Sequence, residues 1–271
     1  MKKHPLFCVL ILIVLISACV STPKREKVQQ DLWYYTFTIL LNPDRPHDSP
    51  KLDVELSLLN VNNYPAEQAE YLNKLLYSTN SFDEYKDQVI EKQRKRYRDS
   101  LFDTATHSVE KNSASHHWHY AESINIKSSG QQGIIIDRDY YIYSGGAHGL
   151  STKRYYVIDM EQQKQLRIND LFADYQGDNR LRDIIYFELG KYSRLKSGQK
   201  LSEGIFFSDE PALSFNFFVS NEGLGLYWDP YQIAPYAYGN IKIIIPWQVI
   251  RPLMLTESIE LLTKFGIYLF V

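Results

Sequence analysis

The 271-residue chain has little cysteine, since only Cys8 and Cys19 occur in it. Two cysteines cannot build a disulfide framework. An excess of basic residues is also missing: 30 Lys and Arg stand against 32 Asp and Glu. This balance argues against a nucleic-acid partner. Hydrophobic residues make up 44% of the chain, which excludes a wholly disordered protein.

Several nucleotide-binding and hydrolase signatures are absent as well. The sequence contains no Walker A loop, no G-x-G-x-x-G, no G-x-S-x-G and no S-x-x-K motif. No cofactor is expected on these grounds.

Long hydrophobic runs are missing except at the N-terminus, where residues 6–16 are apolar. This run is shorter than the roughly 20 residues of a membrane-spanning helix. It follows Met1-Lys2-Lys3 and ends in Ile16-Ser17-Ala18-Cys19, a pattern typical of a signal peptide. The ending resembles the bacterial lipobox, which predicts cleavage after Ala18 and lipidation of Cys19 by acyl chains such as palmitate. A plain secretory signal or an uncleaved anchor is the alternative.

The predicted location of the protein follows from this N-terminal signal sequence. We expect a lipid-anchored protein of the bacterial cell envelope, with the membrane as partner through the anchor. Val20, rather than Asp, follows the cysteine, which resembles lipoproteins sent to the outer membrane, facing the periplasm, if the source is Gram-negative. The expected organisation is a signal peptide over 1–18, a polar tether over 19–31 and one domain over 32–271.

The domain reads as a mixture of strands and helices. Helical composition covers 65–102 with a break near 78–81, where Ser81 and Glu84 form a capping-box pattern, and also 179–196. The tail from 258 is a helix or a strand. Strand patterns cover 32–41, 52–58, 116–126, 132–143, 152–158, 205–207, 212–219, 223–227 and 241–245. Without a βαβ rhythm, this order predicts an α+β fold with a mainly antiparallel sheet and helices packed on it.

One ordered set of motifs is distinctive. Residues 140–149 read Tyr-Tyr-Ile-Tyr-Ser-Gly-Gly-Ala-His-Gly, and residues 166–172 read Leu-Arg-Ile-Asn-Asp-Leu-Phe. Later come Asn-Glu-Gly-Leu at 221–224, a Tyr- and Pro-rich stretch over 227–239 and Ile-Pro-Trp at 245–247. The set resembles the RsiV/PdaC-type extracytoplasmic domain family, best over residues 132–255.

The resemblance implies an envelope domain that contacts a ligand. In this family the RsiV-type members are anti-sigma factors whose outer domain binds lysozyme, and the PdaC-type members carry a separate peptidoglycan deacetylase domain. This chain shows no segment before the signal peptide and no Thr-Phe-Asp-Asp-Gly motif. We therefore expect neither a sigma-factor partner nor a deacetylase domain.

Candidate contact residues cluster in two of these motifs. Gly146 and His148 lie in the glycine-rich turn, where three glycines indicate a sharp bend or a close approach. The tyrosine-rich stretch offers flat apolar faces and hydroxyl groups, which suit sugar rings and protein hot spots. Its candidates are Tyr227, Trp228, Tyr231, Tyr236 and Tyr238. A purely structural role, with the turn stiffened by His148 and the core edge closed by the rings, is the alternative.

Weaker candidates would support an enzyme instead. His117 and His119 share one face of a predicted strand and could offer two zinc ligands. Asp137 and Asp139 also share a face, as a glycosidase pair would. The leading prediction is nevertheless a non-catalytic binding module for a wall glycan or for a glycan-acting protein such as lysozyme. The alternatives are a hydrolase or deacetylase of envelope polysaccharide with a His-centred site, or a purely structural lipoprotein.

Overall fold

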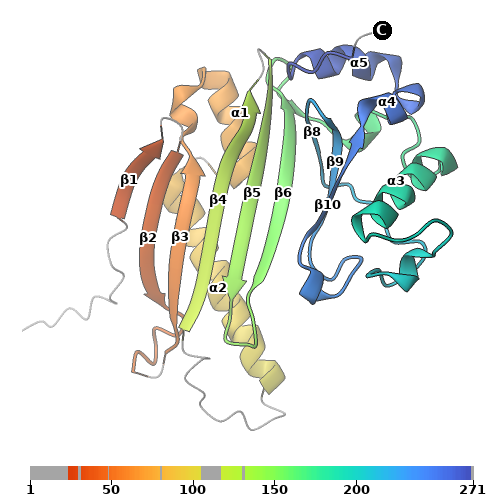
Figure 1. Ribbon diagram of the computed structural model, residues 1–271. Helices are drawn as coiled ribbons and strands as arrows, with labels where there is room; N and C mark the ends of the chain where they lie inside the picture. The colour runs from red at the N-terminus through yellow and green to blue at the C-terminus, as the bar shows by residue number, and fades with distance from the viewer. Residues whose placement is uncertain are drawn as a thin grey trace, which may run out of the picture.

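The computed structural model describes residues 24–29, 32–47, 49–79, 81–104, 117–129 and 132–269. They form two sheets with helices packed on them, and the predicted α+β class is confirmed (Figure 1). The expected signal peptide over 1–18 and Cys19 lie outside this part of the chain. Within the described ranges, none of the helices combines the length and apolar character that a membrane crossing needs.

The large sheet has seven strands in sequence order. Neighbours are antiparallel except β3 and β4, which are parallel. A parallel pair needs a crossover, and α1 and α2 supply it on one face of the sheet (Figure 1). The strands are β1 (Lys24–Gln29), β2 (Leu32–Leu40), β3 (Lys51–Leu59), β4 (His117–Ser129), β5 (Gly133–Tyr143), β6 (Leu150–Asp159) and β7 (Lys164–Gln165).

Strand β1 corrects one expectation. Residues 24–29 were expected to belong to a tether over 19–31, but they pair antiparallel with β2. The physical reason is that β2 would otherwise present an unpaired row of backbone N–H and C=O groups at the sheet edge. The mainly polar composition of β1 suits such an edge position.

The crossover helices fall where the composition predicts them. Helix α1 (Ala66–Tyr77) follows Pro65 and ends at Ser78, which adopts a left-handed conformation at φ 56°. Helix α2 (Phe82–Thr104) begins after Ser81, whose hydroxyl accepts a hydrogen bond from the Glu84 N–H at 3.2 Å. The predicted break and cap are therefore both present.

The small sheet has the strand order β10-β9-β8 and lies beside β6 (Figure 1). Its elements are β8 (Phe217–Val219), β9 (Gly223–Trp228) and β10 (Ile241–Pro246), with α3 (Asn179–Tyr192), α4 (Trp247–Ile250) and α5 (Thr256–Thr263) around them. The strand predicted over 205–207 is wrong, and that over 212–219 is reduced to β8. Isolated hydrogen bonds rather than a ladder serve their backbone: the Phe207 N–H donates to the Ile233 carbonyl at 3.0 Å, and Trp228 Nε1–H donates to the Ala212 carbonyl at 2.8 Å.

Two hydrophobic clusters form the core, and β5 belongs to both. Ile134 and Ile136 pack with the crossover helices, whereas Ile135 packs with the small sheet and α3. Successive side chains of a strand point to opposite faces, so the apolar run that begins β5 serves two cores at once. Val157 and Ile158 divide in the same way on β6.

A buried ion pair joins the large sheet to its helices. The Nε–H of Arg138 donates to Glu122 at 2.8 Å, and Arg138 also donates to the Tyr85 hydroxyl and the Leu76 carbonyl. Glu122 accepts a further hydrogen bond from Tyr120 at 2.8 Å. Both charged residues are almost fully buried, so each depends on the other for compensation.

Removing one partner of this pair should be costly. We expect Arg138→Met to lower the free energy of unfolding by about 3–5 kcal/mol, because the Glu122 carboxylate would remain buried without a cation. The double variant Arg138→Met/Glu122→Leu should recover most of that loss in urea denaturation. A double-variant loss equal to the sum of the two single losses would contradict the coupling.

The buried tyrosines predict an alkaline limit to stability. Burial raises the pKa of Tyr77, Tyr85 and Tyr120 above the ordinary value of 10.0, and the Glu122 charge adds to the effect. The stabilisation that these phenols contribute is therefore fully present below pH 10 and is lost as the pH rises above it, because the unfolded chain releases these protons at a lower pH than the folded chain. We expect part of the phenolate absorbance to appear only together with loss of the circular dichroism of the fold. Complete tyrosine ionisation in a folded chain would contradict this.

Candidate functional site

The glycine-rich turn joins β5 to β6 at one end of the large sheet. Gly145 has φ 78°, a region that favours glycine. Gly149 lies against the ring of Tyr141, since a Cβ at this position would come within 2.4 Å of the ring. The Tyr143 hydroxyl donates to the Gly146 carbonyl at 3.1 Å and holds the tip of the turn.

The tyrosine-rich stretch after β9 folds into a fixed loop. The Asp229 N–H donates to the Gln232 side chain at 2.9 Å, and the Gln232 N–H donates back to the Asp229 carbonyl at 3.2 Å. Tyr231 sits between them in a left-handed conformation, at φ 69°. Non-glycine residues seldom adopt this region, and such strain is found most often where surrounding contacts fix a functional geometry.

The turn and the loop meet through their rings. His148 stacks on Tyr236, with centroids 3.7 Å apart and 15° between the planes, and Tyr236 in turn stacks with Tyr231 at 5.5 Å. The Tyr236 hydroxyl donates to the Gly149 carbonyl at 2.7 Å. We call Gly146, His148, Tyr231 and Tyr236 the turn–loop cluster. Four of the predicted contact residues thus come together from segments more than 80 positions apart.

Both nitrogens of the His148 ring have partners. Nδ1 lies 3.1 Å from the Gly149 carbonyl and Nε2 lies 3.5 Å from the Tyr231 hydroxyl. Nδ1 is placed to donate to the carbonyl, and Nε2 faces the phenol oxygen. The ring is therefore oriented by the loop, as the structural interpretation of this histidine expects.

The remaining candidates of the loop divide between surface and core. Tyr238 is 50% exposed and Tyr231 is 55% exposed, so both rings are available to a partner. Gly146 is also open, since a Cβ there would meet nothing within 4 Å. Tyr227 and Trp228 are only 4% and 2% exposed, which corrects the expectation that they contact a ligand. They lie on β9 in the small sheet, where every residue of the strand is buried.

Asp229 anchors the loop to the large sheet. Its carboxylate accepts a hydrogen bond from the Lys153 N–H at 2.8 Å and lies 3.6 Å from the Arg154 guanidinium. Asn216 does the same nearby, accepting from the Tyr155 N–H at 2.9 Å and donating to the Lys153 carbonyl at 2.7 Å. Burial raises the pKa of Asp229, and the Lys153 and Arg154 contacts oppose that rise. The carboxylate acts here as a backbone acceptor.

A groove of about 300 Å³ lies over the sheet face opposite the crossover helices, lined mainly by residues of β2 to β6. Tyr141, which supports Gly149, lies in it together with Tyr34, Glu55 and Asn240. Sequence reasoning missed this groove. Alternation along β5 does place Asp137, Asp139 and Tyr141 on one face of the sheet. The residues that line the groove beside them come from neighbouring strands, and the sequence does not reveal the order of those strands.

The histidine pair lies at the border of this groove. Trp118 is buried under the helices, and His119 points to the opposite face, as the alternation predicts. The Nε2 of His119 lies 3.5 Å from Glu55, and its ring centroid is 5.4 Å from that of Tyr141. His117 is exposed. Within the described ranges, no group of three or more His, Cys, Asp or Glu residues is placed to hold a metal ion.

The carboxylate pair on β5 binds lysine. Lys153 Nζ donates to Asp137 at 2.8 Å and to Asp139 at 2.9 Å, and Lys127 Nζ lies 3.0 Å from Asp137. Burial alone would lower the pKa of Lys153, but these hydrogen bonds outweigh it and raise the pKa. Asp137 is fully buried, so the glycosidase interpretation of this pair does not fit. Glu222, another acid near the loop in sequence, is exposed in the turn before β9.

A family comparison covers the loop but not the turn. Residues 169–248 match the family described as "Protein of unknown function (DUF3298)". The match includes Tyr231, Tyr236 and Tyr238, and it begins after His148. It covers less than half of the chain, and it carries no stated activity.

Two kinds of relative are found. The chain is 29% identical over 134 residues to the peptidoglycan-N-acetylmuramic acid deacetylase PdaC of Bacillus subtilis, covering 48% of this chain and 28% of PdaC. The expected resemblance to PdaC is thereby confirmed, and it leaves most of PdaC unmatched. A crystal structure of a DUF3298 family member from Bacteroides fragilis has a TM-score of 0.66 at 17% identity, over 88% of this chain and 96% of that one. A DUF3298 family structure from Pseudomonas aeruginosa gives 0.50 at 14% identity, over 86% and 94%. These similarities show a shared fold.

The two glycines of the turn should respond differently to a methyl group. We expect Gly149→Ala to lower the free energy of unfolding by about 1–3 kcal/mol, because the Tyr141 ring must move. Gly146→Ala, in open space, should change it by less than about 0.5 kcal/mol. Chemical denaturation of the two variants checks this, and equal losses would contradict the packing described for Gly149.

Proposed function

We propose that this chain is a non-catalytic binding module of the cell envelope, and that the turn–loop cluster is its contact surface. The ligand is a wall glycan or a glycan-acting protein such as lysozyme. The observation that carries the proposal is the stack of His148, Tyr236 and Tyr231, in which an exposed tyrosine is held in a strained conformation by fixed neighbours. Such rigid aromatic groups lose little entropy on binding.

The form of the cluster fits recognition better than chemistry. The rings of Tyr231 and Tyr238 are exposed, and the glycine at 146 is open, so the turn and the loop offer flat apolar faces and an accessible backbone. Aromatic anchors of this kind dominate both sugar binding and protein hot spots. His148, the one candidate base of the cluster, has a carbonyl and a phenol as its partners.

The envelope setting rests on two further supports. The lipobox-like sequence that ends at Cys19 predicts an anchor outside the cytoplasm. The chain is similar to PdaC, whose name states an action on peptidoglycan. This similarity supports the wall polymer as a ligand class. The matched part of PdaC is too small a share of that enzyme to transfer its activity.

Calorimetric titration of the full chain in detergent tests the proposal, with lysozyme and, separately, muropeptides as ligands. We expect saturable binding to one of them and a loss of about tenfold or more with Tyr231→Ala, which removes an exposed anchor. Tyr231→Phe should retain most of the affinity, because the stacking ring remains. Tyr268→Ala is the matched control, since Tyr268 is 63% exposed and distant in sequence.

The outcome separates the candidate functions. Binding of lysozyme alone makes this chain a sensor or inhibitor of that enzyme, and binding of muropeptides alone makes it a wall-attachment module. Absence of both, or equal affinity of Tyr231→Ala and the parent chain, overturns the proposed role of the cluster. Turnover of wall fragments that His148→Ala abolishes would favour the hydrolase alternative instead.

A further inference from the structure

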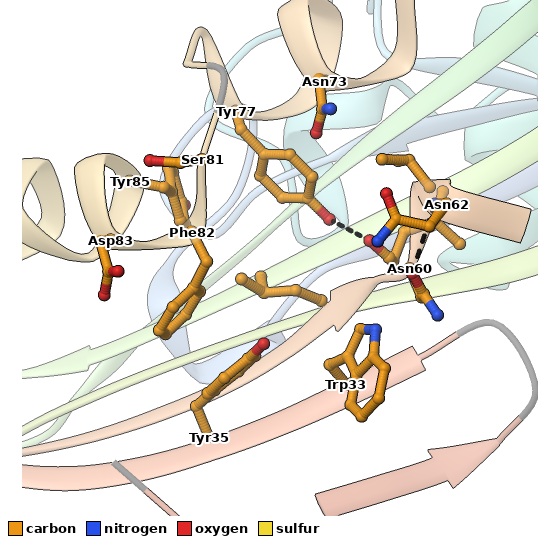
Figure 2. A pocket seen from close by; sticks show the side chains of 13 residues that line it. Trp33, Tyr35, Asn60, Asn62, Asn73, Tyr77, Ser81, Phe82, Asp83 and Tyr85 are labelled. Carbon is orange, nitrogen blue, oxygen red and sulfur yellow. Dashed lines mark hydrogen bonds between the residues drawn. The ribbon is translucent and has the colours of Figure 1, made fainter. Parts of the chain in front are cut away.

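A second cavity lies on the other side of the large sheet, between β2 and the crossover helices. It has a volume of about 490 Å³ and opens beside the turn from α1 to α2. Figure 2 shows its lining: Trp33 and Tyr35 rise from β2, Phe82 faces Tyr35, and Tyr77 reaches across from α1. Cavities of a few hundred Å³ with aromatic walls and a few polar groups are the usual form of small-ligand sites.

The aromatic part of the cavity is ordered by contacts among its own members. Tyr35 and Phe82 stack with centroids 3.7 Å apart and 15° between their planes. The Tyr77 hydroxyl donates to the Leu59 carbonyl at 3.1 Å, so its ring forms a fixed wall. Trp33 is half-buried at the mouth. Flat rings in such positions can pack against the C–H face of a sugar.

The polar part consists of amides. Asn60, Asn62 and Asn73 line the cavity, Asn73 from α1 and the other two from the end of β3 and the turn after it (Figure 2). Asn60 is 6% exposed, and its oxygen accepts from the Asn62 N–H at 3.3 Å. Asn73 is half-buried and Asn62 is exposed, so their side-chain amides are accessible to a ligand that enters the cavity.

The charge of the lining limits the chemical class of ligand that the cavity can bind. Among the lining residues whose side chains the structure describes, Asp83 is the one charged group, and it pairs with Lys86 at 3.3 Å. An anion would meet the Asp83 carboxylate in this lining, which would repel it. Amides, by contrast, both donate and accept, which matches hydroxyl and acetamido groups.

We propose that this cavity is a second binding site of the protein and that it takes a neutral pyranose, an N-acetylhexosamine unit without a carboxylate. It is separate from the turn–loop cluster, because the two share no residue and lie on opposite faces of the sheet. It therefore stands on its own geometry and does not require the cluster to bind anything.

Tryptophan fluorescence of the full chain in detergent tests the site directly. The chain has four tryptophans, of which Trp118, Trp228 and Trp247 are buried and Trp33 borders the cavity. We expect triacetylchitotriose to give a saturable change in emission. Asn73→Ala and Asn62→Ala should each weaken its affinity about three- to tenfold, the effect of one lost hydrogen bond. N-acetylmuramic acid, which carries a carboxylate, should bind more weakly than the neutral sugar.

Two controls keep the proposal open to refutation. Gln88→Ala removes an exposed amide from α2 outside the cavity and should leave the affinity unchanged. Tyr268→Ala removes an exposed ring outside the cavity and should also leave the affinity unchanged. No saturable change with triacetylchitotriose overturns the site. Affinity lost in Tyr231→Ala and retained in both asparagine variants would overturn it too, since the sugar would then bind at the turn–loop cluster.

Discussion

Two side chains complete the open edge of β6, and the arrangement of the candidate site depends on them. Strand β7 pairs only with the last two residues of β6, so the backbone near Lys153 has no neighbouring strand on that side. Asp229 and Asn216 take over this role, since they bond the Lys153 N–H, the Lys153 carbonyl and the Tyr155 N–H. Unpaired backbone groups in such a position are costly, so these bonds fix the small sheet against the large one. They also place the loop of Tyr231 beside the turn of His148.

The side chains of β5 alternate between the two faces of the large sheet, and each face serves a different part of the molecule. One face carries Arg138 into the helix-covered core, and the other carries Asp137 and Asp139 toward Lys153 and the small sheet. Each face of β5 thus carries charged side chains as well as apolar residues that pack in a core. The arrangement leaves a groove on one face of the large sheet and an aromatic cavity under the helices on the other.

Local patterns in the sequence predicted most of the elements and part of the site. The period of β3 and the break at Ser78 were legible because each depends on neighbouring residues. Tyr227 and Trp228 were misjudged, because their burial depends on a pairing with β10 and β8 that composition does not reveal. The cavity of Trp33 and Asn73 was missed for a related reason: its walls come from two strands, a turn and two helices. His148 and Tyr236 were both named as candidates, yet only the fold shows that they stack.

The edge strand β1 has a geometric consequence for an anchored protein. If Cys19 carries the lipid, only five peptide units separate it from Lys24, where the sheet begins. A chain of that length spans at most about 18 Å. The connection between the lipid and the sheet would then be short, and it would hold the β1–β2 edge close to the bilayer. The other strands of the large sheet would lie progressively further from that edge. The order of the strands would therefore decide how far each surface lies from the lipid.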